Sequence, residues 1–237
     1  MRVADFIAER LKLLGCTDVY MVTGGAAMHL NDAFAKAFGS KVHCLHHEQS
    51  CAIAAESFAR ITGRPCIVNV TAGPGGINAI NGVFGAYVDS IPMIVVSGQA
   101  KRETLLTNSN TPGLRQLGDQ EVDIVRMVSG ICKASLLIQD PQQIHQAVNE
   151  AYQQATSGRP GPVWLDVPID VQATPLPDAY DGLIRQSLTE GIISHHKDPE
   201  AAESDLQELA NQDRKSTRLN SSHSSVSRMP SSACKKK

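Results

Sequence analysis

The residue of this 237-residue chain that is best placed for chemistry is Glu48, which follows a short apolar segment and opens an alanine-rich stretch. The apolar segment, residues 42–45, has the pattern of a buried strand, and the stretch after it has the pattern of a helix. In an open parallel sheet, ligands bind in the crevice beyond the carboxyl ends of the strands. We therefore expect Glu48 to contact a ligand. The alternative is an ordinary acidic residue in the first turn of a helix, where the macrodipole favours negative charge.

Two glycine-rich corners follow two other apolar segments in the same way. Gly24 and Gly25 form the first corner, and Gly73, Gly75 and Asn78 belong to the second. Glycine lets a flat ligand approach the backbone and leaves amide N–H groups free to donate. Neighbouring parallel strands would bring both corners close to the glutamate. A tight turn with helix capping explains each corner without a ligand.

The second corner departs from the dinucleotide-binding fingerprint. The run from Gly73 through Gly75 to Asn78 lacks the third glycine, and Asp89 comes earlier than the acidic residue expected about 20 residues further on. The sequence therefore gives little support to a nicotinamide site.

Strand-like and helix-like segments alternate through residue 170. The expected strands are residues 19–22, 42–45, 67–70, 92–96, 134–138 and 162–167. Continuous apolar strands joined by helices predict an α/β fold, a doubly wound parallel sheet with helices on both faces. The helix after the glutamate carries on one face Ile53, Ala54, Ser57 and Phe58. A polar stretch, residues 101–120, interrupts the alternation, and loops of this length are usually functional or mobile.

Composition narrows the class of protein. Hydrophobic residues make up 42% of the chain and aromatic residues only 4%, so small and aliphatic side chains must fill the core. The net charge of −2 gives no reason to expect nucleic acid or a membrane as partner. Six cysteines without a CxxC pair indicate buried thiols in a reducing compartment. We expect a cytoplasmic protein.

Three histidines raise the question of a metal site. His43, His46 and His47 lie close together in sequence, but their spacing along a strand points them to different faces. No cysteine or acidic residue completes a converging set of ligands. We expect no metal site in this segment.

The C-terminal part has a different composition. Residues 172–213 are expected to be a linker and the start of a truncated further domain. Residues 214–237 contain seven of the 22 Lys and Arg residues, eight serines and no acidic residue, so they cannot form a core. We expect this disordered tail to have no biological meaning, because it resembles a translated adapter sequence. A basic arm that binds nucleic acid is the alternative.

Taken in order, these motifs resemble the N-terminal, pyrimidine-binding domain of thiamine diphosphate enzymes, and in particular the acetolactate synthase large subunits. The resemblance covers residues 3–171, and it implies that residues 1–171 form the cofactor-binding domain. The segments that carry it are residues 24–26, 47–49, 55–60, 73–78, 89–92 and 158–163.

The resemblance implies a catalytic role for Glu48. In this family the glutamate hydrogen-bonds N1′ of the aminopyrimidine and favours its 4′-imino tautomer, which takes the C2 proton and yields the ylid that attacks a 2-oxo acid. The resemblance assigns cofactor binding to Gly24, Gly25, His47, Gly73, Gly75 and Asn78. Gln120 matches a glutamine near the substrate path. Asp119 precedes it where acetolactate synthases typically have Phe, so an apolar wall becomes charged.

The resemblance also implies parts that this sequence lacks. In the family, a later domain holds the diphosphate and its Mg²⁺ through a Gly-Asp-Gly run, and FAD is common in acetolactate synthases. The active site forms between subunits of a homodimer or homotetramer that acts in branched-chain amino acid biosynthesis. We therefore expect this chain to hold half a site and to turn over nothing alone.

Two other functions stay open. The chain could be the pyrimidine-binding subunit of a split thiamine diphosphate decarboxylase that a separate chain completes. It could also be a non-catalytic nucleotide-binding module, because one fold hosts many functions.

Overall fold

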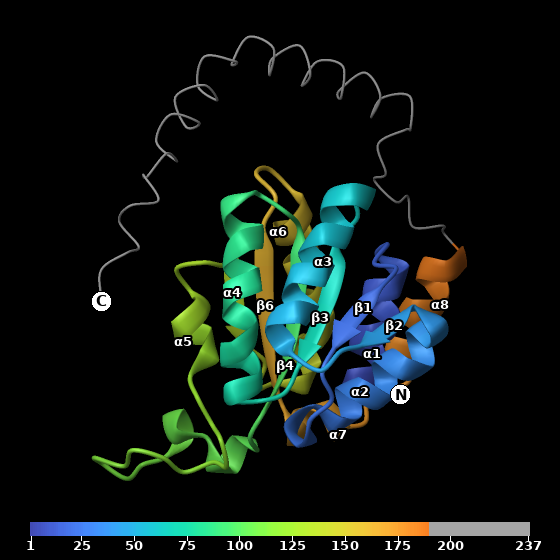
Figure 1. The fold of residues 1–237 in the computed structure, drawn as a ribbon. Helices are drawn as coiled ribbons and strands as arrows, with labels where there is room; N and C mark the ends of the chain where they lie inside the picture. The colour runs from blue at the N-terminus through green and yellow to red at the C-terminus, as the bar shows by residue number, and fades with distance from the viewer. Residues whose placement is uncertain (190–237) are drawn as a thin grey trace, which may run out of the picture. The chain divides into compact units, whose positions relative to one another are not determined.

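Six parallel strands form one sheet in the order β2-β1-β3-β4-β6-β5, within residues 1–189, the part of the chain that the computed structural model describes (Figure 1). The strands are β1 (Val19–Met21), β2 (Val42–Cys44), β3 (Cys66–Val70), β4 (Met93–Gln99), β5 (Ala134–Leu137) and β6 (Pro162–Pro168). Each strand falls within two or three residues of its expected range. The predicted parallel sheet is confirmed.

Helices connect the strands. They are α1 (Val3–Leu13), α2 (Met28–Phe38), α3 (Glu48–Thr62), α4 (Pro74–Val88), α5 (Ile124–Val128), α6 (Ile144–Thr156), α7 (Ile169–Ala173) and α8 (Ala179–Thr189). Short 3₁₀ turns are η1 (Gly25–Ala27), η2 (Gly39–Lys41), η3 (Arg102–Thr104), η4 (Leu106–Asn108) and η5 (Pro141–Gln143). The sequence pattern did not predict α5, which begins where the Asp123 carboxylate accepts a hydrogen bond from the Arg126 amide at 3.0 Å.

Both faces of the sheet are covered. On one face, α1, α2 and α6 pack against Ile94 and Val96, and on the other, α3, α4 and α5 pack against Met93 and Val95. This alternation along β4 is the period of two that a strand imposes on its side chains. Trp164 is fully buried. The doubly wound arrangement with helices on both faces is confirmed.

Small residues set the packing of α3 against α4, which lie side by side (Figure 1). A Cβ added at Gly82 would lie 2.6 Å from the Cβ of Ala52, so the two helices touch there. The buried residues of α3 are Cys51, Ala52, Ala55 and Ala59. The face that carries Ile53 and Phe58 is therefore not the buried one, and Ile53 is 45% exposed.

Four cysteines are buried as expected: Cys16, Cys51, Cys66 and Cys132. Burial raises the pKa of each of these thiols, so they stay protonated at neutral pH. The expectation of buried thiols is wrong for Cys44, which is exposed because it ends the edge strand β2. Cys234 lies outside the described residues.

The segment after β6 packs on the first helix. The Tyr180 ring meets Phe6 edge to face at 5.3 Å, and its hydroxyl donates to the Gln142 carbonyl at 2.8 Å. The N-terminal amine lies 3.8 Å from Asp181. The expected domain boundary after residue 171 stays a prediction. Most of the expected second segment, from residue 190 to 213, and the tail at 214–237 lie outside the described residues. The described part contains no helix long and apolar enough to cross a membrane.

One carboxyl group is buried at the carboxyl end of the sheet. Asp166 on β6 accepts hydrogen bonds from the Ser97 hydroxyl at 2.5 Å and from Gln99 Nε2 at 2.8 Å. Burial raises its pKa from 3.8 to about 7, because the charged form loses its hydration, although both hydrogen bonds act in the opposite direction.

This pKa predicts an unusual pH dependence of stability. Between 3.8 and about 7 the folded chain binds the Asp166 proton more tightly than the unfolded chain, so this group lowers the free energy of unfolding as the pH rises. The slope is at most about 1.4 kcal/mol per pH unit. The unfolding free energy of Asp166→Asn minus that of the wild type should therefore be larger at pH 8 than at pH 5. Urea unfolding at both pH values measures this difference. An equal difference at both pH values would contradict the assignment.

Candidate functional site

Three adjacent strands bring the predicted motifs together. β1 lies between β2 and β3, and all three are parallel. Gly24 follows β1, Glu48 follows β2, and Gly73 follows β3. The chain steps outward from β1 to β2 and then crosses to β3, so the strand order reverses beside β1. Such a switch point is where open α/β sheets bind ligands.

The Glu48 carboxylate is held by the helix that follows β3. Glu48 opens α3 and is half-buried. Its Oε2 accepts a hydrogen bond from Asn78 Nδ2 at 2.7 Å, and the same amide nitrogen lies 3.4 Å from His47 Nε2. A Cβ added at Gly75 would lie 3.6 Å from Glu48 Oε1. The structure therefore brings together four of the predicted residues: His47, Glu48, Gly75 and Asn78.

Three of these residues, Glu48, Gly75 and Asn78, line a pocket of about 670 Å³. Its walls are formed by Glu48, Gln49, Thr71, Pro74, Gly75, Ile77, Asn78 and Asn81. Gln49 Nε2 donates to Asn81 Oδ1 at 2.9 Å across the gap between α3 and α4. A carboxylate beside amide groups and apolar walls suits a flat heterocycle whose ring nitrogen shares a proton with the carboxylate.

Thr71 joins the two glycine corners and is a residue that sequence reasoning missed. A Cβ at Gly24 would lie 2.4 Å from Thr71 Cβ, and one at Gly75 would lie 2.7 Å from Thr71 Cγ2. Packing therefore explains both glycines. A Cβ at Gly25 would meet no atom within 4 Å. The available signal for Thr71 was its place at the start of the second glycine motif. Asn81, also missed, lies one helical turn after Asn78.

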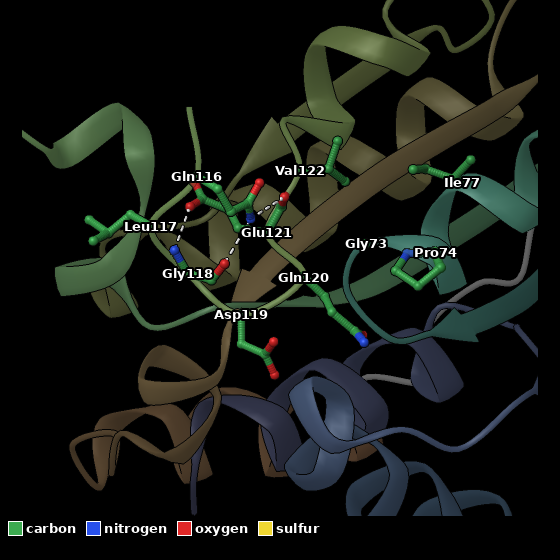
Figure 2. A pocket seen from close by; sticks show the side chains of 10 residues that line it. All are labelled: Gly73, Pro74, Ile77, Gln116, Leu117, Gly118, Asp119, Gln120, Glu121 and Val122. Atoms are coloured by element: carbon green, nitrogen blue, oxygen red, sulfur yellow. Dashed lines mark hydrogen bonds between the residues drawn. The ribbon is translucent and has the colours of Figure 1, made fainter. Parts of the chain in front are cut away.

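Gln120 lies beside a second pocket of about 660 Å³ (Figure 2). This pocket is lined by Gly73, Pro74, Ile77 and residues 116–122, and it shares Pro74 and Ile77 with the first. Gln120 has a φ of 54°, which is uncommon for a residue other than glycine. A Cβ at Gly73, itself at a φ of 59°, would lie 2.1 Å from the Gln120 carbonyl oxygen. Gln120 therefore packs directly on the turn after β3.

The loop that carries Gln120 is fixed by its own side chains. The Glu121 carboxylate accepts hydrogen bonds from the amides of Leu106 at 2.5 Å and Gly118 at 3.2 Å. Gln99 Nε2 donates to the Val122 carbonyl at 2.9 Å. Figure 2 shows the side chains of Asp119 and Gln120 among those that line the pocket. Among the described residues, Asp119 forms no hydrogen bond or ion pair.

The histidines do not converge on a metal. His43 Nε2 lies 2.8 Å from Asp18 Oδ1, and its ring stacks on Tyr20 at 4.6 Å, whereas His47 faces Asn78. Within residues 1–189, no group of three or more His, Cys, Asp or Glu side chains could hold a metal ion.

The contact with Thr71 predicts different effects of substitution at Gly24 and at Gly25. Gly24→Ala should cost about 1–3 kcal/mol of unfolding free energy, because its methyl group would overlap Thr71. Gly25→Ala, where the methyl group meets nothing, should stay within about 0.5 kcal/mol of the wild type. Urea unfolding of both variants measures the difference. Equal stabilities would contradict the packing described here.

Comparisons with known proteins agree with this geometry. A family model described as "Thiamine pyrophosphate enzyme, N-terminal TPP binding domain" matches residues 1–127. The chain is 36% identical over 199 residues to probable acetolactate synthase 2, chloroplastic, from Oryza sativa subsp. japonica, covering 84% of this chain and 28% of that protein. It is 36% identical over 169 residues to acetolactate synthase, chloroplastic, from Arabidopsis thaliana, covering 71% and 24%. The chain thus spans about a quarter of the length of these relatives. It belongs to the thiamine pyrophosphate enzyme family and carries that family's N-terminal cofactor-binding domain.

Proposed function

We propose that this chain supplies the pyrimidine half of a thiamine diphosphate site in an acetolactate synthase-like enzyme that acts on 2-oxo acids. The observation that carries the proposal is the Glu48 carboxylate, which Asn78 holds at a pocket lined by Gly75 and by Thr71, the residue against which Gly24 packs. The relatives are named acetolactate synthases, which supports the reaction class. Because the chain spans about a quarter of the length of these relatives, we assign the activity to a longer assembly that includes this chain.

The residues of the pocket fit the aminopyrimidine ring. Asn78 Nδ2 donates a hydrogen bond to Glu48 Oε2. The other carboxylate oxygen, Oε1, lies beside Gly75 and accepts no hydrogen bond from the described chain. Oε1 is therefore free to hold or share a proton with a ring nitrogen. Gly75 adds no side chain to this wall, and Pro74 and Ile77 give it an apolar surface.

Each protein group then has a defined task. Thiamine diphosphate, when bound, supplies the carbon nucleophile that adds to a 2-oxo acid. Glu48 governs the protonation of the pyrimidine ring, and Asn78 orients the carboxylate. The remaining cofactor contacts are assigned to Gly24, Gly25, His47, Gly73 and Gly75. Gln120 is assigned to the substrate because its pocket adjoins that of Glu48.

Assembly with further protein is part of this proposal. The outer face of α3 and α4 exposes large apolar side chains, namely Ile53, Ile77, Phe84, Tyr87 and Val88. Such patches typically mark interaction sites, which supports a homodimer or homotetramer of the full-length enzyme. Mg²⁺ and the diphosphate would be held by the part beyond this chain, and FAD would belong to that enzyme. We keep the cytoplasmic location as a proposal, although the relatives are named chloroplastic.

Glu48→Gln tests the assignment in an assembled enzyme. The chain would be combined with the part of the rice relative that follows the matched segment, and C2 proton exchange of thiamine diphosphate would be followed by NMR. The variant should exchange at least about 100-fold more slowly, because the amide cannot share a proton with the ring.

Glu56→Gln is the matched control, since Glu56 lies on the same helix but pairs with Arg60 instead of facing the pocket. It should exchange as the wild type does. Normal exchange in Glu48→Gln would refute the catalytic role. Failure of the assembled wild type to bind thiamine diphosphate would refute the proposed function as a whole.

A further inference from the structure

The corner after β1 is held by side-chain amides that do not line either pocket. Asn31 on α2 donates from Nδ2 to the Gly24 carbonyl at 3.3 Å. Gln172 on α7 donates from Nε2 to the Ala26 carbonyl at 2.7 Å. The carbonyl groups on both sides of Gly25 are thus bonded by amides from two different helices, 7 and 146 residues away in sequence.

Asn31 is itself held from inside the sheet. Asn69 Nδ2 donates to Asn31 Oδ1 at 2.6 Å. Asn69 lies in the middle of the buried strand β3, paired with Met21 and Val96, and it is fully buried. Central parallel strands are normally runs of aliphatic residues, and an amide at such a position is uncommon.

Backbone packing fixes the other sides of the corner. A Cβ at Gly98 on β4 would lie 2.1 Å from the Ala26 carbonyl oxygen. Gly24 is pressed against Thr71, which lines the pocket with Glu48. The position of the corner therefore sets the position of one pocket wall.

Two of these three amides, Asn69 and Gln172, carry an unsatisfied oxygen. Asn69 Oδ1 and Gln172 Oε1 are buried and have no hydrogen-bond partner among the described residues. A buried acceptor without a partner costs about 1–3 kcal/mol. One of these costs lies at Gln172, which bonds the corner, and the other at Asn69, which holds Asn31; together they indicate selection for the geometry of the corner over stability.

We propose that Asn31, Asn69 and Gln172 are positioning residues that fix the corner at residues 24–26 against Thr71 and so shape the Glu48 pocket before a ligand binds. The inference rests on the proposed function for the identity of the ligand, an aminopyrimidine. The fixed corner itself depends only on contacts within this chain. Groups held in place in advance do not have to be ordered on binding, which favours affinity.

Asn69→Leu in the full chain is the first test. Leu removes the unsatisfied oxygen and releases Asn31, which is only half-buried and can turn to water. Replacing an unsatisfied buried polar group by an apolar one of similar shape is neutral or stabilising, so resistance to urea should be unchanged or higher. The Ala27 amide, which donates to the Gly24 carbonyl at 3.2 Å, should exchange its hydrogen at least about ten-fold faster.

Binding gives the second measurement. Affinity for 4-amino-5-hydroxymethyl-2-methylpyrimidine, the ring portion of the cofactor, should fall at least about ten-fold in Asn69→Leu. Gln172→Met provides an independent variant from the other side of the corner and should show the same two changes. Ser97→Ala is the control, because it removes a buried hydrogen bond to Asp166 on the neighbouring strand without touching the corner.

The outcomes separate the two hypotheses. Unchanged Ala27 exchange in both variants would overturn the positioning role. A loss of stability together with proportionally faster hydrogen exchange at every amide would also overturn the positioning role. That result is expected if these residues are merely structural. Faster Ala27 exchange in a chain whose wild type binds no aminopyrimidine would support the fixed corner and overturn the proposed function instead.

Discussion

The site depends on the packing of one threonine between two glycines. Thr71 directly follows the central strand β3, and its side chain leaves no room for a Cβ at Gly24 or Gly75. Because β1 and β3 are neighbours, the two corners that follow them must share the space above their ends. A single β-branched side chain fills this space, so neither corner can shift without displacing the other. This contact joins the two glycine corners into one closely packed wall.

A second constraint sets the distance between Glu48 and Asn78. Glu48 begins α3 and Asn78 lies one turn into α4, and their hydrogen bond is possible only because the two helices lie close together. The closeness comes from Ala52 and Gly82, where one added carbon would overlap the facing helix. Small residues far from the pocket therefore decide whether the carboxylate meets its amide partner. An ordinary leucine-rich helix pair would hold the axes about 10 Å apart.

Sequence patterns predicted the strands, their parallel pairing and the meeting of Glu48 with the second glycine corner, at Gly75 and Asn78, because these follow from local periodicity and from the geometry of adjacent strand ends. They did not predict Thr71 as the joint between the corners, or the contact of Asn69 with Asn31. Such contacts depend on the register of β1 against β3 and on where α2 lies over the sheet. Neither quantity is encoded in the spacing of a single segment. The helix α5 was missed because five residues are too short for a period of 3.6 to appear.

The small-residue contact between α3 and α4 also explains why their outer face is apolar. With alanine and glycine between the helices, the large side chains Ile53, Phe84 and Tyr87 have no place inside and lie at the surface. Ile77, which is 43% exposed, borders both pockets and continues this apolar face. On the proposed function, a protein surface that covers the face would therefore also close the pocket over Glu48. Burial of the apolar face and exclusion of water from the carboxylate would then occur together, since α3 and α4 provide both the apolar face and the walls of the pocket.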